Sequence, residues 1–299
     1  MKKILLIFVF IAAQTFGQGA GSNGLSFLKI GFGSRNIAMG DLGVASATDV
    51  TALNYNPAMI TKLQNTQIFI SHNQWIQDVT GEMLGVNFKV FGLPFAFGLN
   101  TTNISGFEIR TKPTPEPEAK FDIHYFYSSL STGFNLIENL SAGITYKFLY
   151  ENILSDEATG YAFDFGILYE GGLKGLTTGF SLKNIGSMNE LRNEATKLPV
   201  DLRCGVNYNF EVEQIKSDIT ITSGIQKYVD LAENHFIAGA EIFYDNIFAL
   251  RLGYMSGYES RGLSFGAGLV WNNLNFDYAF APFSYGLGTI HSISIICNF

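Results

Sequence analysis

Short segments in which hydrophobic and polar positions alternate follow one another from Thr66 to the end of the chain. In LSAGITYKFLYE, residues 140–151, every second residue is apolar and most of the others are polar or glycine. Residues 161–170, 200–210 and 274–280 repeat the pattern. A period of two is typical of β-strands with two unlike faces. The alternation therefore predicts an all-β structure for most of the chain.

About fourteen such segments can be counted, near 66–76, 81–91, 94–106, 121–134, 139–152, 158–171, 175–185, 198–210, 216–228, 234–244, 247–257, 262–272, 274–282 and 288–299. The links between them are alternately short and long. Short links include 91–94, 245–246 and 272–273, and long links include 111–120, 153–160 and 184–199. An even strand number with short turns at one end and long loops at the other is typical of bacterial outer-membrane barrels.

Three features favour a membrane barrel over a soluble β-sandwich. Aromatic residues gather toward the ends of the apolar faces, as interfacial girdles do. Many segments are long enough to cross a bilayer as tilted strands. The polar faces also carry charges in mid-strand, which a polar lumen accommodates, and we expect the following lumen charges: Lys89, Lys147, Asp164, Arg203, Glu241, Arg251 and Asp277. The fold class predicted is an antiparallel transmembrane β-barrel of about fourteen strands.

The composition agrees with this prediction. Charged residues make up 15% of the chain and aromatic residues 14%, so an unusually large aromatic surface must face an apolar medium. The net charge of −7 and the lack of a dense basic patch argue against nucleic acid as a partner.

The N-terminus has the features of a secretory signal peptide. Two lysines precede an apolar run of about ten residues, which is followed by small residues. We therefore divide the chain into a signal peptide at 1–18, an N-terminal segment at 19–63 and a transmembrane barrel at 64–299. The predicted location is the bacterial outer membrane.

The segment 19–63 precedes the first strand and contains the stretch ASATDVTALNYNPAMI, which is small, polar and interrupted by proline. A fourteen-stranded barrel is wider than one that side chains can fill, so an open lumen would leak. Placing 19–63 inside the barrel as a plug closes the lumen. Pro57 restricts Asn56 to extended or turn geometry, which lets the chain turn before it reaches the first strand.

The stretch GSRNIAMGDLGVASATDVTALNYNPAMI resembles the N-terminal signature of the PorV/PorQ family of FadL-like outer-membrane barrels. The matching features are a Gly-Ser-Arg start, a Met-Gly step, a Gly-Val-Ala stretch, an aspartate and Asn-Pro-Ala. The resemblance assigns the plug motif to Arg35, Gly40, Asp49, Asn56, Pro57 and Ala58. We also expect Arg35 or Asp49 to meet a wall residue of opposite charge.

The resemblance implies a component of type IX protein secretion that binds secreted cargo or other secretion proteins and carries out no chemistry. The alternative is a FadL-like channel for hydrophobic small molecules. Relatives of that kind use a kinked strand as a lateral exit, and Pro94 and Gly98 could interrupt the third strand in the same way. Outer-membrane lipid is a partner in either case, and no cofactor is expected.

Few residues suggest catalysis. Ser264 lies in a G-x-S-x-G sequence, but it falls within an alternating strand, whereas a nucleophile elbow needs a strand–turn–helix context. An outer-membrane hydrolase that uses Ser264 stays a third hypothesis, and the prediction is that the protein is not an enzyme. The histidines show no metal-site spacing, although His124 and His235 would face the lumen. Cys204 and Cys297 would point outward as free thiols.

Two further segments suggest partners. The sequence ends in HSISIICNF, and a terminal Phe299 on an alternating last strand resembles the signal that bacterial barrel-assembly machinery recognises. The stretch TKPTPEPEAK, residues 111–120, is rich in proline and charge, so it should form an exposed loop. That loop is either a docking surface or a solvated connection.

Overall fold

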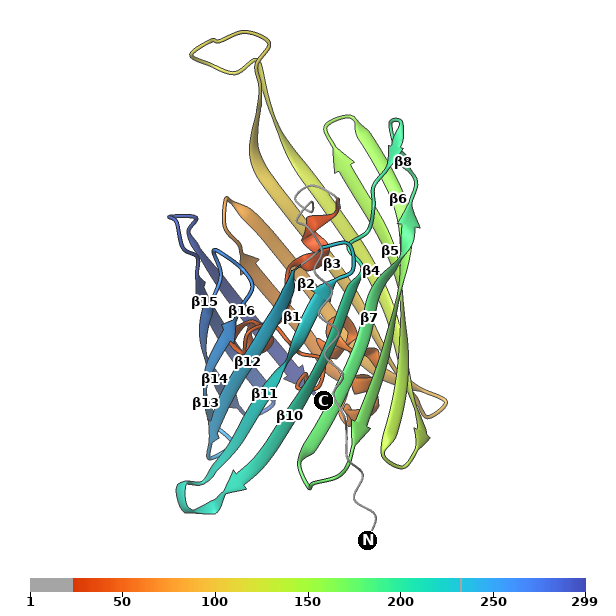
Figure 1. Cartoon of the computed structure of the whole chain (residues 1–299), viewed down its shortest axis with the longest axis vertical. Coiled ribbons are helices and arrows are strands. Elements are labelled where there is room, and N and C mark those ends of the chain that lie inside the picture. The colour runs from red at the N-terminus through yellow and green to blue at the C-terminus, as the bar shows by residue number, and fades with distance from the viewer. Residues whose placement is uncertain (1–23, 232) are drawn as a thin grey trace.

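The computed structural model describes residues 24–231 and 233–299, and the predicted signal peptide lies outside them. Within these ranges, fourteen antiparallel strands form one closed barrel (Figure 1). The strands of the wall are β1 (Gln67–Gln74), β2 (Val79–Val90), β3 (Leu93–Ile109), β4 (Ala119–Ile137), β5 (Leu140–Ile153), β6 (Asp156–Glu170), β7 (Leu176–Met188), β10 (Asp201–Val212), β11 (Ser217–Tyr228), β12 (Asn234–Tyr244), β13 (Phe248–Met255), β14 (Leu263–Trp271), β15 (Leu274–Pro282) and β16 (Thr289–Asn298). Each pairs with its neighbour in sequence, except that β7 pairs with β10 and that β1 pairs with β16 to close the wall.

The remaining elements are short: η1 (Ser26–Lys29), α1 (Ser34–Ala38), α2 (Ala52–Tyr55), η2 (Pro57–Lys62), η3 (Glu213–Ile215) and a two-stranded hairpin of β8 (Glu190–Leu191) and β9 (Glu194–Ala195). Among the described residues, no helix is long and apolar enough to cross a membrane.

The two ends of the barrel differ as the link lengths predict. At the end where β1 begins and β16 finishes, which we call the periplasmic end, the strands are joined by tight turns such as Phe91-Gly92. At the opposite, extracellular end, the hairpin of β3 and β4 projects farthest (Figure 1). One predicted loop is wrong. Residues 153–160 lie mostly in β5 and β6, because these strands stay paired up to Ile153 and Asp156 and leave only Leu154 and Ser155 between them.

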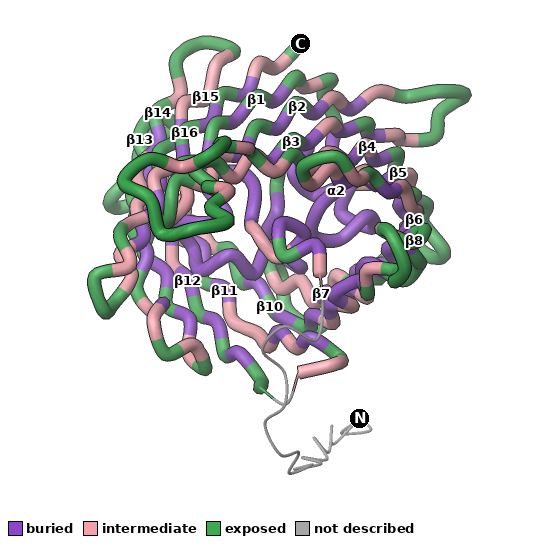
Figure 2. Tube along the Cα trace, turned by 90° about the horizontal axis from the view of Figure 1, so that it is seen from above, coloured by how far each residue is buried: buried purple, intermediate pink, exposed green. Residues whose placement is uncertain are grey.

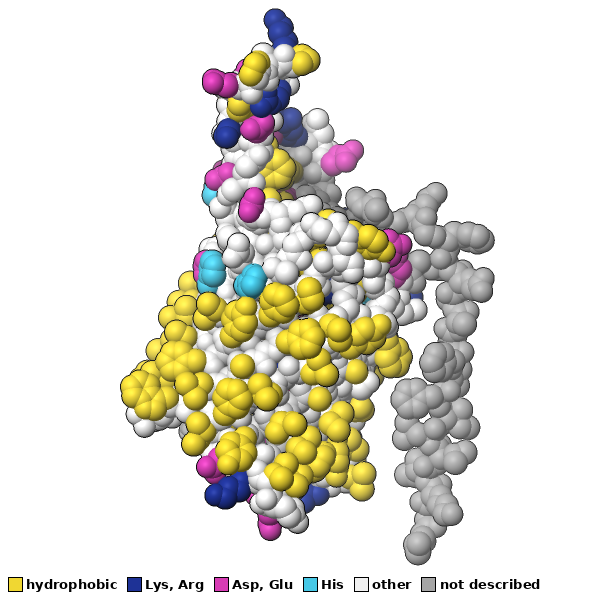
Figure 3. Space-filling view, turned by 90° about the vertical axis from the view of Figure 1, so that its left-hand side faces the viewer, with side chains coloured by type: hydrophobic (Ala, Val, Ile, Leu, Met, Phe, Trp, Pro, Cys, Tyr) yellow, Lys and Arg dark blue, Asp and Glu magenta, His cyan; other side chains and the backbone are white. Residues whose placement is uncertain are grey.

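The outer surface of the wall is apolar. Hydrophobic side chains form a broad band over the barrel, whereas charged side chains lie near its lower end and on the projecting hairpin (Figure 3). The alternate positions point inward and are buried, as in β5, where Ser141, Thr145 and Lys147 are covered. Cys204 and Cys297 are free and belong to the outward-facing set.

Residues 24–63 lie in the lumen, and most of them are buried (Figure 2). We call this stretch the plug. It begins at the extracellular end, where the Gly24 amide donates to the Lys197 carbonyl at 3.1 Å. From there α1 packs against β13 to β16, and η2 packs against β3 to β6 before the chain enters β1. The plug therefore touches both halves of the wall.

The plug rests directly on wall glycines. An added Cβ on Gly143 would lie 2.4 Å from the Pro57 carbonyl carbon, and one on Gly179 would lie 2.1 Å from the Val44 oxygen. Glycines lie against the plug on each strand from β2 to β7 and from β10 to β14, and we name these residues the glycine belt: Gly85, Gly98, Gly133, Gly143, Gly166, Gly179, Gly205, Gly224, Gly239, Gly253 and Gly266. Six of them, Gly133, Gly143, Gly166, Gly179, Gly239 and Gly253, face plug backbone, and the other five face plug side chains. Because these positions carry no side chains, the plug can approach the wall backbone closely.

The third strand is not interrupted at Pro94 or Gly98. Both residues keep their register partners, Pro94 with Lys89 on β2 and Gly98 with Ser129 on β4. Gly98 instead leaves room for Leu53 of the plug. The register between β3 and β4 shifts between Ile104 and Phe107, nearer the extracellular tip of this hairpin.

Gly143→Ala tests the glycine belt. The new methyl group would meet plug backbone, which cannot rotate away as a flexible side chain can, so we expect a loss of about 1–3 kcal/mol of stability. The measurement is the temperature at which the folded barrel loses its altered migration in detergent gels, together with conductance in planar bilayers. Gly262→Ala is the matched control, since its Cβ would come no closer than 3.6 Å to Tyr254. Equal behaviour of the two variants would contradict the role of the belt.

Candidate functional site

The extracellular part of the lumen is filled by apolar side chains of the plug. Phe27 stacks on Tyr125 of β4 with ring centroids 4.6 Å apart and lies 6.0 Å from the ring of Tyr127. Leu25, Leu28 and Phe32 of the plug are buried in the same cluster. We call these six residues the mouth cluster. It gives the lumen an apolar, aromatic lining on the side that faces the cell exterior.

Below the mouth cluster, charged residues of the wall form a buried ionic layer. The Lys147 ammonium lies 2.7 Å from the Asp164 carboxylate, and the Arg203 guanidinium lies 2.9 Å from the Asp201 carboxylate. Arg203 also donates to the carbonyl of Leu42 at 3.2 Å, which joins the layer to the plug. Lys183 is the fifth member of the layer, 3.9 Å from Asp201.

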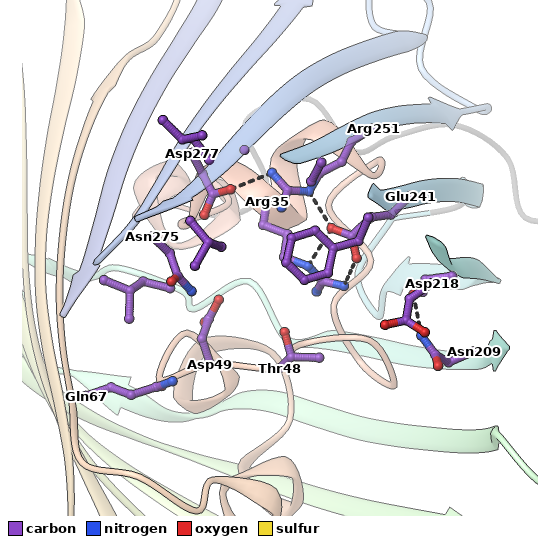
Figure 4. Close-up of a pocket in the computed structure, with 17 residues that line it drawn as sticks. Arg35, Thr48, Asp49, Gln67, Asn209, Asp218, Glu241, Arg251, Asn275 and Asp277 are labelled. Atoms are coloured by element: carbon purple, nitrogen blue, oxygen red, sulfur yellow. Dashed lines mark hydrogen bonds and ion pairs between the residues drawn. The ribbon is translucent and has the colours of Figure 1, made fainter. Parts of the chain in front are cut away.

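On the periplasmic side, the plug and the strands from β10 to β16 enclose a polar cavity of about 270 Å³ (Figure 4). Its central feature is a chain of ion pairs. Arg35 of α1 donates to both oxygens of Glu241, at 2.9 and 2.7 Å. Arg251 bridges Glu241 and Asp277, each at 2.5 Å. The cavity also has Asp49 on its plug side.

Local structure fixes Arg35 in this chain of ion pairs. Gly33, with φ of 88°, is the N-cap residue that precedes α1, and the Ser34 hydroxyl lies 2.8 Å from the Ser292 hydroxyl on β16. Arg35 then donates to the Ser46 carbonyl as well as to Glu241. Burial opposes its charge, but the carboxylates of Glu241, Asp49 and Asp277 together outweigh that effect and raise the pKa of Arg35 above its usual value. Arg35 therefore stays charged and ties the plug to β12.

The Asn-Pro-Ala part of the plug motif forms a second attachment. Asn56 is extended, and its side-chain amide donates to the carbonyls of Val44 at 2.8 Å and of Ile167 on β6 at 3.0 Å. The side-chain oxygen of Asn56, Oδ1, accepts from the Ala58 amide and caps η2, which begins at Pro57. Gly166 of the glycine belt makes this approach possible, because an added Cβ would lie 2.0 Å from the Asn56 oxygen.

The other motif residues have local roles. Gly40 has φ of 83°, and an added Cβ would lie 2.8 Å from Ile237 of β12. One Asp49 oxygen accepts from the Thr51 amide at 2.8 Å. Asp49 forms no ion pair among the described residues and faces the periplasmic cavity. It is Arg35 that meets a wall residue of opposite charge.

Two expected lumen residues lie elsewhere. Lys89 is exposed at the periplasmic end of β2, one residue before the strand finishes, so it belongs to the rim and takes no part in the ion pairs. His124 is exposed, because it falls on the outward phase of β4, in which Tyr127 and Ser129 point inward. His235 is buried, as expected, and stacks on Tyr258. Phe299 is exposed beyond β16 and donates its amide to the Thr66 carbonyl.

The sequence patterns did not single out Asp201, Lys183 and Asp41 as charged residues of the lumen. Lys183 is in phase with Gly179 and Ser181 on the inner face of β7, so alternation could have identified it. Asp41 is buried in the plug, where the Tyr55 hydroxyl donates to its carboxylate at 2.5 Å. No periodicity of the plug indicates that contact.

Ser264 lies in β14, and its hydroxyl donates to the Ala38 carbonyl of the plug at 3.0 Å. Beside it, Gly266 leaves room for the Ala38 methyl group. The motif therefore packs against the plug on a strand and lacks the helix that a nucleophile elbow requires.

No protein-family model matches the chain, and no curated protein matches it. Solved structures do. The Ralstonia pickettii toluene transporter TbuX aligns with a TM-score of 0.61 at 13% identity, over 90% of this chain and 98% of that one. The CymD monoaromatic hydrocarbon channel aligns with a TM-score of 0.62 at 13% identity, over 93% and 99%. A Pseudomonas aeruginosa FadL homologue aligns with a TM-score of 0.53 at 12% identity, over 89% and 98%.

At these identities the likeness shows the fold, which is that of the FadL-like outer-membrane barrels. Together with the apolar outer band, it places the protein in the bacterial outer membrane.

Glu241→Gln tests the attachment of Arg35. The substitution removes the carboxylate with which Arg35 pairs, and breaking a buried pair in this way costs about 3–5 kcal/mol. We expect lower resistance to urea and a higher conductance as α1 leaves the wall. Glu82→Gln is the matched control, because Glu82 pairs with His72 where both side chains are more than half exposed. Unchanged stability of Glu241→Gln would show that the ion pair does not hold the plug.

Proposed function

We propose that the protein carries hydrophobic small molecules into the cell across the outer membrane. The observation that supports this best is the mouth cluster: aromatic and aliphatic side chains of the plug fill the extracellular part of the lumen and pack on Tyr125 and Tyr127 of the wall. Binding sites for small molecules are mostly apolar, with a few polar groups that orient the ligand. The similar structures named for toluene and monoaromatic hydrocarbons support the same class of solute.

The plug side chains of the mouth cluster occupy the space that a solute would take. Phe27 already stacks on Tyr125 as an aromatic ligand could. The start of the segment that carries it is held by the backbone hydrogen bond from Gly24 to Lys197, and its end by hydrogen bonds from Asn73 to the Gly31 carbonyl at 3.3 Å and from Tyr55 to the Phe32 carbonyl at 2.9 Å. Charged and buried contacts of Arg35 and Asn56 fix the deeper parts of the plug. In our proposal, a solute enters by displacing residues 25–32 while the rest of the plug stays attached.

Phe27→Ala tests this proposal. Removal of the ring vacates the place beside Tyr125, so we expect toluene uptake by bacteria that express the variant to rise several-fold over wild type. The measurement is accumulation of radiolabelled toluene by cells with an intact lipopolysaccharide layer. Phe107→Ala is the control, because Phe107 stacks on Phe121 in the projecting hairpin. Uptake by wild type no greater than by cells without the protein would refute the proposed function.

A second candidate is the role in type IX secretion that the resemblance to PorV/PorQ implies. It is favoured by the plug motif, whose Arg35 and Asn56 bind the wall, and by the projecting hairpin. The tip of that hairpin is exposed. Two hydrogen bonds to carboxylates stabilise it, since Arg110 donates to Glu108 at 2.9 Å and the Thr111 amide donates to Glu118 at 3.1 Å. Such a tip could dock secreted cargo or another secretion protein.

Affinity isolation of the intact protein from detergent-solubilised membranes tests the second candidate. If it is correct, secretion proteins or cargo should co-purify, and replacing residues 112–117 by a short Gly-Ser turn should abolish their recovery. Replacing the β6–β7 turn, residues 171–175, at the opposite end of the barrel provides the control. Recovery that is the same with and without the tip would exclude the hairpin as the docking site.

A further inference from the structure

Lys183 differs from the other cations of the ionic layer. Its side chain is 7% exposed, and its nearest carboxylate, that of Asp201, lies 3.9 Å away, beyond hydrogen-bond distance. Asp201 is itself engaged by Arg203 at 2.9 Å and by the Gln226 amide at 3.1 Å. A buried ammonium group without an acceptor is costly. Lys183 thus retains an unused capacity to donate hydrogen bonds.

The charges around Lys183 do not cancel. Lys147 is paired with Asp164, and Arg203 with Asp201. Arg261 lies 3.9 Å from Asp41, whose other partner is the Tyr55 hydroxyl. The four cations Lys147, Lys183, Arg203 and Arg261 thus face three aspartates, so this group carries one positive charge in excess. It can therefore accept one negative charge.

The surroundings of Lys183 are aromatic. Its ammonium lies 5.8 Å from the centre of the Tyr55 ring. A small cavity of about 10 Å³, roughly the size of a water site, has Lys183, Lys147 and Arg203, the aromatic Tyr55 and Tyr127, and the apolar Leu28 and Phe32 in its lining. Leu28 and Phe32 belong to the mouth cluster. Displacing them would join this cavity to the apolar space at the extracellular mouth.

We propose that Lys183 is the specificity-determining residue for a solute that carries one carboxylate on a flat, apolar body, such as a small aromatic acid. This inference rests on the proposed function, because the solute reaches Lys183 only by displacing residues 25–32. Its ring takes the place of Phe27 and Phe32, and its carboxylate accepts from the Lys183 ammonium. A neutral hydrocarbon can use the apolar space but leaves Lys183 without an acceptor.

Benzoate and toluene are a suitable pair of probes, because they share the ring and differ in the charged group. Binding to the detergent-purified, full-length barrel is measured by equilibrium dialysis with radiolabelled compounds. We expect Lys183→Met to weaken benzoate binding by about tenfold to a hundredfold, the value of a charge-assisted hydrogen bond, and to leave toluene binding unchanged. Lys183→Arg should retain most of the affinity for benzoate. Altered gel migration of the unheated variants verifies folding.

The outcomes separate this inference from the proposed function. Equal benzoate affinity of wild type and Lys183→Met would overturn the role of Lys183, while toluene binding would still support a hydrophobic solute. Binding of chloride at the site without binding of benzoate would also overturn it, because the anion that Lys183 accepts would then be inorganic. Loss of toluene binding in every form, wild type included, would refute the proposed function itself.

Discussion

The structure depends on close contact between the plug and the glycines on the inner face of the wall. A barrel of this width encloses more space than its own inward side chains would fill. Residues 24–63 fill it because the glycine belt removes side chains from strand after strand along the path of the plug. Van der Waals contacts of this kind are individually weak but collectively large, and they leave the ion pair of Arg35 and the hydrogen bonds of Asn56 to define the register.

The lumen changes character along its axis. The mouth cluster is apolar, the ionic layer beneath it is densely charged, and the periplasmic cavity is polar and has Asp49 and Asp277 in its lining. A hydrocarbon would be favoured in the first region and disfavoured in the last. If the protein carries solutes as proposed, the charged groups of the middle decide how far a given solute can penetrate, and Lys183 matters more for selectivity than the apolar mouth.

Much of this fold could be predicted from the sequence, because alternation with a period of two depends on which side of the wall each residue faces. The same rule placed Lys147, Asp164 and Arg203 correctly inside the lumen. It failed for Lys89, because phase does not reveal where a strand meets solvent, and for residues 153–160, because polar residues can extend a hairpin beyond the membrane. Pro94 does not interrupt β3, since a proline at the start of a strand need not break its pairing. Contacts within the plug, such as Tyr55 with Asp41, depend on an irregular path that has no period.

The path of the plug also bears on how the barrel closes. Gln67 and Asn298, which meet across the seam of β1 and β16, are separated by 231 positions. Docking of α1 on β16 through Ser34 and Ser292 shortens the remaining loop to the roughly thirty residues that connect α1 to β1. By the logarithmic dependence of loop entropy on length, this shortening lowers the cost of joining the seam by about 2 kcal/mol. The plug thus also provides a second, shorter connection between the first and last strands of the wall.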